Sequence, residues 1–573
     1  MDLVRRIYLY AMSAVALGVL LFGLQALLTV LLHAIGLRGS LISGEFDSDR
    51  QALSLAIALV GVGLPVWAVH WYFVERGLRG TGPDSESERS SALRALYLSG
   101  VLAVLLLIGA LAVADIIRFL LERLLPNIDV YYADPATSLA SLIVMAAGWV
   151  LHAWTRRRDL ARGELGGAAA WWPRTYRYGV AFVGLVFFVE GIGALLALGL
   201  DALTGSGQDP SFPEAYTFRL AQALPNVLIG LVAWASHAWA SDRLASGSGW
   251  HAASERASRF RLAYWPLVVG VAAIAVLGHA AQGLRPVVAL LIGADPTGLG
   301  TPDRGLTVVI AGAAGAAGAA LPWLGAWWLH RRWAQVAASA SGETGRAALA
   351  DRLERHFVAG VGLASGAVGV GWVAGLAIDV LLGGNRAFGD AWRFELGQYM
   401  AFAVMGLPLW TWNWTRLTAR RTADPTGEAG SAVRRAYLLL AVGVAILSTL
   451  GSLAIVLYRL VSTLLGAGLG GNAVSELSTP LGALAVTAAV VVYHGLALRS
   501  DQAVRAPEAA SAAPAIEAVP VAAVPDGPST EAAPGEPAVR RTLVLTAPAD
   551  ADIAGTLAAL RGALPEGQSL DEA

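Results

Sequence analysis

The sequence predicts an all-α, polytopic transmembrane helix bundle of about twelve spans, and three observations lead to this fold class. Of the 573 residues, 56% are hydrophobic and only 14% are charged, whereas soluble domains carry about a quarter charged residues. Apolar runs of spanning length recur along the whole chain. Arginine is concentrated in alternate loops between those runs, as expected of a chain that crosses a membrane repeatedly.

About twelve apolar runs reach the roughly 20 residues that a spanning helix needs. The first run is longer than the apolar core of a signal peptide, so we predict a retained first helix. The run at 138–155 is barely long enough, and the run at 262–282 continues past Pro286. The runs lie near residues 7–33, 52–74, 95–121, 138–155, 178–200, 218–240, 262–282, 305–329, 357–383, 396–415, 436–465 and 478–498.

The runs pair into six two-helix repeats. Each odd run begins behind arginine and an aromatic residue, as in Arg94-Ala95-Leu96-Tyr97, and these beginnings recur roughly every 80–95 residues. Such a period indicates a repeated supersecondary unit. The predicted repeats occupy residues 1–83, 84–163, 164–247, 248–340, 341–427 and 428–505.

The composition changes after the last repeat. Residues 506–539 are rich in alanine and proline without a hydrophobic period, which predicts a disordered linker. Residues 540–573 then have the pattern of a short strand and an amphipathic helix. A segment of this length is too small to hold a core alone, so we predict a short cytoplasmic β-α tail that is available to a protein partner.

Arginine placement predicts the orientation of the chain. The N-terminus, alternate loops and the segment after the last run carry about 28 of the 41 basic residues, whereas the opposite loops and helix ends carry about 10. The positive-inside rule places the first set, with both termini, in the cytoplasm. We therefore expect a multi-pass protein of the plasma membrane whose partners are the lipid bilayer and, at the arginine face, anionic lipid.

Composition also excludes several functions. The formal net charge of −1 offers no overall basic surface, so we expect no nucleic-acid partner. The absence of cysteine excludes disulfides and thiolate metal sites. All 41 basic residues are arginine, which excludes a Schiff-base lysine and a P-loop lysine. We expect no enzymatic activity, and we assign no catalytic residue, cofactor or metal.

A tryptophan–histidine motif ends the even runs and is soon followed by arginine. Because Trp-x-x-His places both side chains on one helix face, two interpretations arise. We favour an interfacial aromatic belt that anchors the helix ends. The alternative is a set of imidazoles that bind a metal or haem or relay protons, although no carboxylate accompanies them at ligand spacing. The best copies are Trp67/His70, Trp149/His152/Trp154 and Trp234/His237/Trp239.

Two acidic residues are candidates for function inside the membrane. Glu190 lies near the middle of its apolar run, where an ionisable group costs at least ~2.5 kcal/mol on insertion scales. A proton or cation step and a satisfied interhelical hydrogen bond explain it equally well. Asp115 lies one helical turn from Arg118, and structural pairing near the outer interface is the favoured explanation.

The repeat pattern resembles a known family. An Arg-x-x-Tyr opening, a long apolar helix, and a second helix that ends in Trp-x-x-His and arginine are similar to a bacterial integral-membrane family known as a domain of unknown function, number 5671. The resemblance covers nearly all of residues 1–500 in tandem copies, with the best at 1–76, 94–158 and 174–243. It implies a multi-pass membrane protein without established activity, and it supplies no catalytic residues.

Two functions remain open from the sequence. The favoured one is a non-enzymatic membrane scaffold or sensor-like component whose arginine face and tail meet partners or anionic lipid. The alternative is a transporter or channel that uses a midplane cavity with Glu190, since internal repeats are common in transporters. Few polar residues lie inside the predicted spans, which disfavours the alternative.

Overall fold

The computed structural model confirms the all-α class: every regular element of the described residues is a helix. The description covers residues 3–37, 45–79, 83–125, 134–161, 167–204, 214–293, 305–340, 344–384, 391–465 and 472–512. The long helices are α1 (Leu3–Ala34), α2 (Glu45–Arg76), α4 (Ala92–Leu124), α5 (Pro135–Leu160), α6 (Trp171–Thr204), α7 (Glu214–Ser246), α9 (Arg259–Leu291), α10 (Gly305–Ala340), α11 (Thr344–Leu381), α12 (Ala391–Ala423), α14 (Ala432–Leu464) and α15 (Ala473–Ala512).

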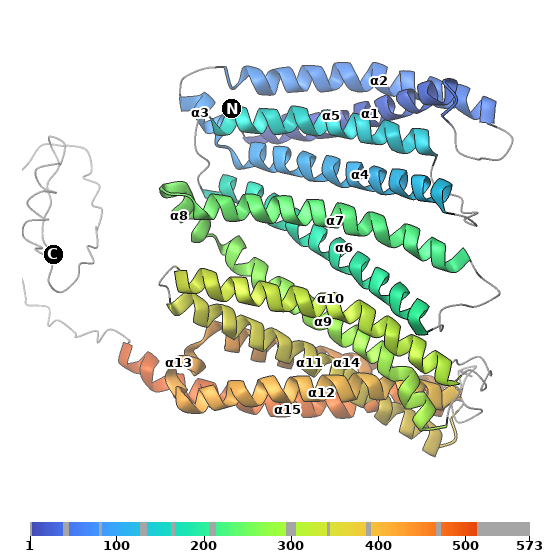
Figure 1. Ribbon diagram of the computed structural model, residues 1–573. Coiled ribbons are helices and arrows are strands. Elements are labelled where there is room, and N and C mark those ends of the chain that lie inside the picture. Colours follow the sequence, from blue (N-terminus) through green and yellow to red (C-terminus); the bar gives the residue numbers. More distant parts are fainter. Residues whose placement is uncertain are drawn as a thin grey trace, which may run out of the picture. The chain divides into compact units, whose positions relative to one another are not determined.

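Consecutive long helices pack as hairpins, and this confirms the two-helix build of the bundle (Figure 1). The hairpins are α1–α2, α4–α5, α6–α7, α9–α10, α11–α12 and α14–α15. Glycine allows the closest crossings. A Cβ added to Gly184 of α6 would lie 2.5 Å from the backbone nitrogen of Trp234 on α7. Small residues at such crossings allow the close backbone approach that drives helix association in lipid.

The hairpins associate in pairs to form three four-helix units. Within each pair, the first helix of one hairpin packs against the second helix of the next: α1 on α5, α6 on α10, and α11 on α15. We call α1–α5 the first unit, α6–α10 the second unit and α11–α15 the third unit. Helix α4 contacts α6 and α7 across one junction, and α9 contacts α11 and α12 across the other.

Eleven of the long helices are long and apolar enough to cross a membrane within the described residues. The exception is α12, which has a span's length but falls outside this set. It contains the polar stretch Thr411–Thr415 and several arginines. The count from the structure is therefore one below the predicted twelve, although α12 packs closely on α11 and α9 as a member of the bundle.

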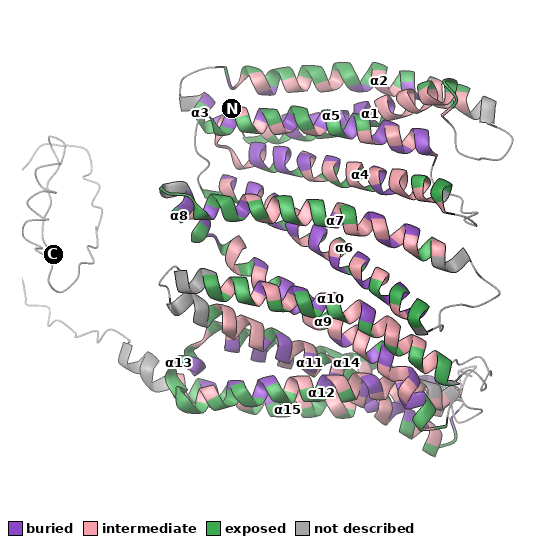
Figure 2. Cartoon of the chain, in the orientation of Figure 1, coloured by how far each residue is buried: buried purple, intermediate pink, exposed green. Residues whose placement is uncertain are grey.

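The outer surface of the bundle is apolar, as a lipid-facing surface must be. Exposed residues recur along the length of the long helices (Figure 2). They include large aliphatic side chains at mid-helix, such as Val62, Val232 and Leu447. Because lipid tails are as apolar as these side chains, the surface needs no further burial in a bilayer.

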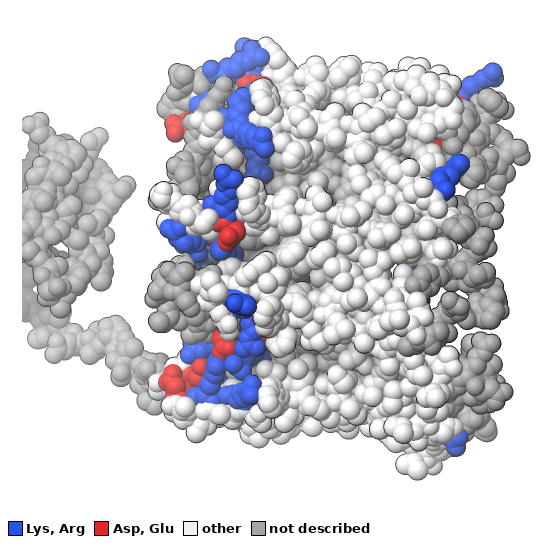
Figure 3. Space-filling view, in the orientation of Figure 1, with Lys and Arg blue, Asp and Glu red and all other residues white. Residues whose placement is uncertain are grey.

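Short helices, which the sequence did not predict, precede the second hairpin of each unit. They are α3 (Pro83–Arg89), α8 (Trp250–Arg256) and α13 (Pro425–Gly430), and all three lie at the same end of the bundle (Figure 1). A 3-10 helix, η1 (Gly167–Ala170), precedes α6. Arginine side chains gather at this end (Figure 3), which we call the arginine-rich end.

Three predicted boundaries change. Helix α5 has 26 residues and exceeds the marginal run at 138–155. Helix α9 continues through Pro286 as one helix. Helix α15 continues to Ala512, so the chain is still helical at residue 506, where the linker was predicted to begin. The rest of that linker and the predicted β-α tail at 540–573 lie outside the described residues.

Candidate functional site

A Glu-x-x-Ser-x-x-Arg-x-x-Tyr motif occurs once in each unit, where the short helix meets the next long helix. The spacing is identical in all three copies. The predicted pattern of arginine with an aromatic residue includes the arginine of every copy, but the glutamate and the serine were not predicted. We call it the Glu–Ser–Arg–Tyr motif, and its copies are Glu88/Ser91/Arg94/Tyr97, Glu255/Ser258/Arg261/Tyr264 and Glu428/Ser431/Arg434/Tyr437.

In the first and second units, the motif serine caps the beginning of the long helix. The Ser91 hydroxyl accepts a hydrogen bond from the backbone N–H of Arg94 at 3.1 Å. Ser258 accepts from the N–H of Phe260 at 3.3 Å. Side-chain oxygens at such N-cap positions satisfy N–H groups that the first helical turn leaves unpaired. The cap therefore fixes the glutamate immediately before the helix and the arginine and tyrosine within its first turns.

The motif glutamate is buried and binds the beginning of the unit. Each glutamate pairs with an arginine from the first helix of its own unit. Burying a carboxylate costs free energy unless the carboxylate is paired and hydrogen-bonded. The arginine therefore stabilises the buried glutamate and connects the short helix to the first hairpin. The ion pairs are Arg6–Glu88 at 2.6 Å, Arg174–Glu255 at 3.1 Å and Arg352–Glu428 at 2.9 Å.

A tyrosine supports the glutamate in two units. The Tyr10 hydroxyl donates to Glu88 at 2.7 Å, and the Tyr178 hydroxyl donates to Glu255 at 2.8 Å. Both tyrosines lie four residues after the arginine that binds the same glutamate, so both side chains share one helix face. The third unit has His356 at this position.

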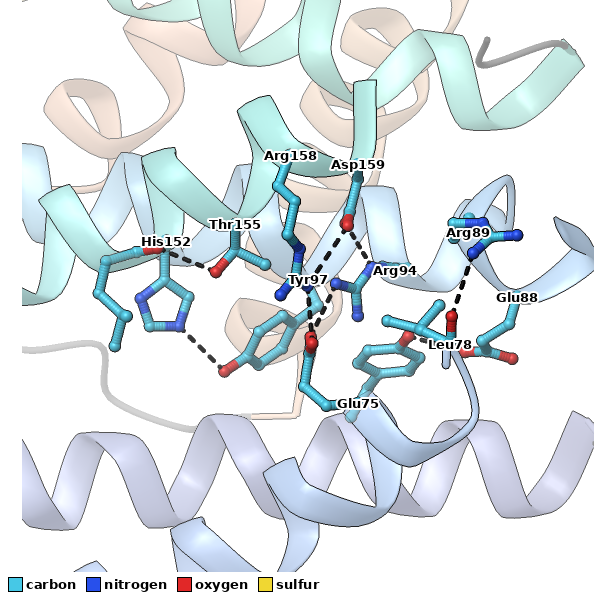
Figure 4. A network of polar contacts seen from close by, with 12 residues as sticks. Glu75, Leu78, Glu88, Arg89, Arg94, Tyr97, His152, Thr155, Arg158 and Asp159 are labelled. Carbon is cyan, nitrogen blue, oxygen red and sulfur yellow. Dashed lines mark hydrogen bonds and ion pairs between the residues drawn. The ribbon is translucent and has the colours of Figure 1, made fainter. Parts of the chain in front are cut away.

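The motif arginine binds the two hairpins of the first unit together (Figure 4). Arg94 donates to Asp159 at 2.6 Å and to Glu75 at 3.1 Å. Arg158 also donates to Glu75, at 2.6 Å. Arg94 itself is almost fully buried, at 1% exposure. The result is a buried ion network between α2, α4 and α5, and such charge-assisted bonds are about twice as strong as neutral ones.

The same arginine has different surroundings in the other units. In the third unit, Arg434 donates to Asp501 at 2.7 Å, and the pair is buried. In the second unit, Arg261 pairs with Asp242 at 3.1 Å, and the Asp242 side chain is 73% exposed. The motif arginine therefore has a buried carboxylate partner in the first and third units and an exposed one in the second.

The motif tyrosine contacts the histidine of the Trp/His motif. The Tyr97 hydroxyl lies 3.3 Å from His152 Nε2, and Tyr437 lies at the same distance from His494 Nε2. His152 Nδ1 lies 2.8 Å from the carbonyl of Gly148. Because Nδ1 must donate to that carbonyl, Nε2 is the acceptor and the tautomer is fixed.

Two further motif histidines make equivalent contacts. His70 Nε2 lies 3.2 Å from the Tyr8 hydroxyl, and His237 Nε2 lies 3.3 Å from the Tyr176 hydroxyl. Each of these four imidazoles therefore has its own tyrosine, whereas His330 Nε2 in the second unit has no hydrogen-bond partner among the described residues. The described residues contain no group of three His, Asp or Glu side chains placed to hold a metal ion.

The motif tryptophans occupy two environments. Trp154 and Trp239 are 58% and 62% exposed, and the guanidinium groups of Arg158 and Arg243 lie 5.3 and 5.1 Å from their rings. Exposed indoles next to arginine suit the headgroup region of a bilayer. The other three pack on buried side chains inside the bundle: Trp67, Trp149 and Trp234.

Glu190 on α6 belongs to a polar group of three helices. Trp323 Nε1 of α10 donates to Glu190 Oε1 at 2.9 Å, and His279 Nε2 of α9 lies 3.9 Å from the same oxygen. The Glu190 side chain is 46% exposed. His279 was not predicted from the sequence, although it is an ionisable residue inside the apolar run 262–282.

This polar group has no counterpart in the first unit. The positions of Arg6 and Arg174 align Glu190 with Phe22 of the first unit, which is 55% exposed. The Glu–Ser–Arg–Tyr motif aligns His279 with Ala112, and the motif histidines align Trp323 with Met145. Three apolar side chains of the first unit are thus replaced by a carboxylate, an imidazole and an indole at mid-helix.

Asp115 and an unpredicted histidine make ion pairs at the opposite end of the first unit. Arg118 donates to Asp115 at 2.8 Å. His33 lies between two carboxylates, 2.9 Å from Asp49 and 2.7 Å from Asp134. Burial acts to raise the pKa of Asp134, but hydrogen bonds from His33 and Thr137 outweigh it and lower that pKa below its usual value.

Comparison with known proteins assigns the family. A family model described as a domain of unknown function, DUF5671, matches residues 6–125, 174–324 and 352–490. The three segments begin at Arg6, Arg174 and Arg352, the arginines that bind the motif glutamates. No curated protein and no solved structure matches the chain. The chain is therefore a helical membrane protein that belongs to the DUF5671 family and carries three tandem segments of it.

Proposed function

We propose that this protein is a non-enzymatic membrane scaffold or sensor-like component of the plasma membrane, with its arginine-rich end in the cytoplasm. The proposal rests on the contacts that polar side chains make at that end. In every unit the motif glutamate and arginine join helices of the same chain. This arrangement makes a rigid row of hairpins and leaves exposed arginines for partners.

The exposed arginines support an interaction with anionic lipid or with a protein. Arg157, Arg332 and Arg435 lie at the arginine-rich end with exposed side chains. Basic side chains near a cytoplasmic leaflet contribute about 1 kcal/mol each to binding of anionic lipid. The tail at 540–573 is proposed as the contact with a protein partner.

Transport through the bundle is the second candidate, and Glu190 with His279 is the observation that favours it. A transport path needs a polar, water-accessible cavity at that depth. A cavity of about 820 Å³ in the described part of the bundle is lined almost entirely by apolar side chains, and Glu190 is not among its lining residues. For this reason the scaffold is the preferred function.

Flux measurements distinguish the two candidates. The full chain is reconstituted in liposomes, and proton and monovalent cation flux is followed with dyes. A scaffold gives the same flux as protein-free liposomes, both for the wild type and for Glu190→Gln. A wild-type flux that Glu190→Gln abolishes would replace the scaffold with a transporter.

Topology is tested separately. A reporter fused after Arg505 is expected in the cytoplasm, because the positive-inside rule places the arginine-rich end there. A reporter found outside the cell would reverse the orientation and remove the cytoplasmic partners from the proposal.

A further inference from the structure

An apolar groove lies at the junction between the first and second units. It has a volume of about 820 Å³ and is lined by α4 and α5 on one side and by α6 and α7 on the other. Along α4 its lining runs from Leu96 to Arg118, which is about 33 Å of helix rise. That length matches the roughly 30 Å hydrocarbon core of a bilayer. We call it the junction groove.

Glycines keep the junction groove open. A Cβ added to Gly100 of α4 or to Gly179 of α6 meets no atom within 4 Å, and both residues line the groove. Gly184 also lines it, but its added Cβ would collide with the backbone of α7. Gly184 therefore serves helix packing, whereas Gly100 and Gly179 leave space that no side chain of this chain fills.

Arg156 of α5 lies beside the groove at the arginine-rich end. Its guanidinium is 5.6 Å from the ring centre of Tyr176, which lines the groove. Arg156 also lines a smaller pocket with Arg89 and Ser99, and Ser99 lines the groove as well. The half-buried cation thus lies where the apolar groove meets the headgroup region.

Arg156 lacks an anionic partner among the described residues. The structure gives it no hydrogen bond and no ion pair there, and the charged side chain that acts on it is Arg177, a like charge. Asp159 lines the same small pocket but is bound by Arg94 at 2.6 Å. Because a partly buried cation without a counter-charge is costly, an anion from outside the chain suits this position.

The opposite end of the groove differs in this respect. Arg118 lines it there, but Arg118 is already bound to Asp115 at 2.8 Å. The uncompensated charge is therefore at the Arg156 end. A ligand with an anionic head and an apolar body would place its head at Arg156 and its body between the helices.

We propose that the junction groove binds one anionic phospholipid of the bilayer, with its phosphate at Arg156 and its acyl chains between α4, α5, α6 and α7. The proposal gives the anionic-lipid part of the proposed function a defined site. It rests on that function only in placing the arginine-rich end at headgroup level, and it stands whether or not the protein transports ions.

The head of the lipid is tested by native mass spectrometry of the delipidated full chain in mild detergent. Titration with phosphatidylglycerol is expected to give a complex with one lipid, at lower concentration than phosphatidylcholine. Arg156→Gln is expected to bind phosphatidylglycerol about tenfold more weakly, because one charge-assisted hydrogen bond is lost. Arg156→Lys keeps the charge and restores most of the binding. Arg50→Gln is the control and leaves binding unchanged, because Arg50 is also exposed but lies near the start of α2, at the opposite end of the bundle.

The acyl chains are tested by filling the groove. The double variant Gly100→Leu/Gly179→Leu places side chains in open space and is expected to lose both phosphatidylglycerol and phosphatidylcholine. Gly18→Leu is the control, because Gly18 also has open space around it but lies on an exposed position of α1. Thermal unfolding in detergent checks that each variant is folded.

Four results would overturn the proposal. The first is a wild type that retains no phosphatidylglycerol, and the second is unchanged binding in Arg156→Gln. The third is displacement of the lipid by inorganic phosphate with normal lipid binding in the double leucine variant, which would indicate a free-anion site. The fourth is a dimer that the double variant abolishes, which would place a second copy of the chain in the groove. None of these results bears on the flux measurement.

Discussion

The first and second units have the same framework but use polar side chains at different depths. In the first unit, Arg94 joins Asp159 and Glu75 in a buried network, and mid-helix positions are apolar. In the second unit, Arg261 has an exposed partner, and the mid-helix position of Phe22 is taken by Glu190. The two units thus share the glutamate–arginine contact that joins their hairpins, whereas the polar group at mid-helix is present in the second unit and not in the first.

The largest expected effect comes from the motif arginines. Arg94→Ala leaves the buried Asp159 and the partly buried Glu75 with less compensation, so the free energy of unfolding should fall by about 3–5 kcal/mol. Arg261→Ala removes a pair whose carboxylate is exposed, and the loss should be about 1 kcal/mol or less. Urea unfolding in detergent measures both. Equal losses would contradict the contrast between buried and exposed pairs.

The polar group of the second unit should give the next effect. Glu190→Leu removes the acceptor of the Trp323 N–H and the contact with His279. Under the scaffold proposal the free energy of unfolding falls by about 1.5–3 kcal/mol, while Phe22→Leu in the first unit is nearly neutral. A more stable Glu190→Leu protein would instead indicate a residue kept for function at the expense of stability.

The motif tyrosines provide a matched pair. Tyr97→Phe removes the hydrogen bond to His152 Nε2 and should cost about 1 kcal/mol. The Tyr264 hydroxyl and His330 Nε2 are buried without a hydrogen-bond partner among the described residues. Tyr264→Phe should therefore be neutral or slightly stabilising. The same unfolding assay decides, and a larger loss for Tyr264→Phe than for Tyr97→Phe would refute this prediction.

The smallest effect is the pH dependence of the first unit. Because the folded pKa of Asp134 is lowered, its ionised form stabilises the fold above the ordinary aspartate pKa of about 3.9. This contribution is lost as the pH falls below that value towards the folded pKa. Asp134→Asn keeps an N-cap residue but removes the charge. The difference in melting temperature between wild type and variant should shrink on acidification, and a constant difference would argue against the charge.

Much of the fold follows from the sequence because lipid imposes simple rules. Spanning length, arginine between the runs and the repeated Trp/His motif predicted the hairpins and their number. The glutamate and the serine of the Glu–Ser–Arg–Tyr motif were missed because Glu88 and Ser91 lie in a polar stretch between two apolar runs, where such residues are common. Its role depends on Arg6, which is distant in sequence.

How far each residue of the Trp/His motif is buried could not be predicted from the sequence either. His152 is buried and Trp154 is exposed, although only two residues separate them, because the side that faces a neighbouring hairpin depends on packing between units. The junction groove was not predictable for the same reason. Gly100 and Gly184 both lie in apolar runs, yet Gly100 faces open space and Gly184 faces the backbone of α7.

The even number of long helices in each unit has an evolutionary consequence. A unit begins and ends at the arginine-rich end, as α1 and α5 do (Figure 1). Duplication of such a segment adds four helices without inverting any that follow, so a lengthened chain inherits the orientation of its ancestor. A chain can therefore contain any whole number of such units with the arginine-rich ends of all of them on one side.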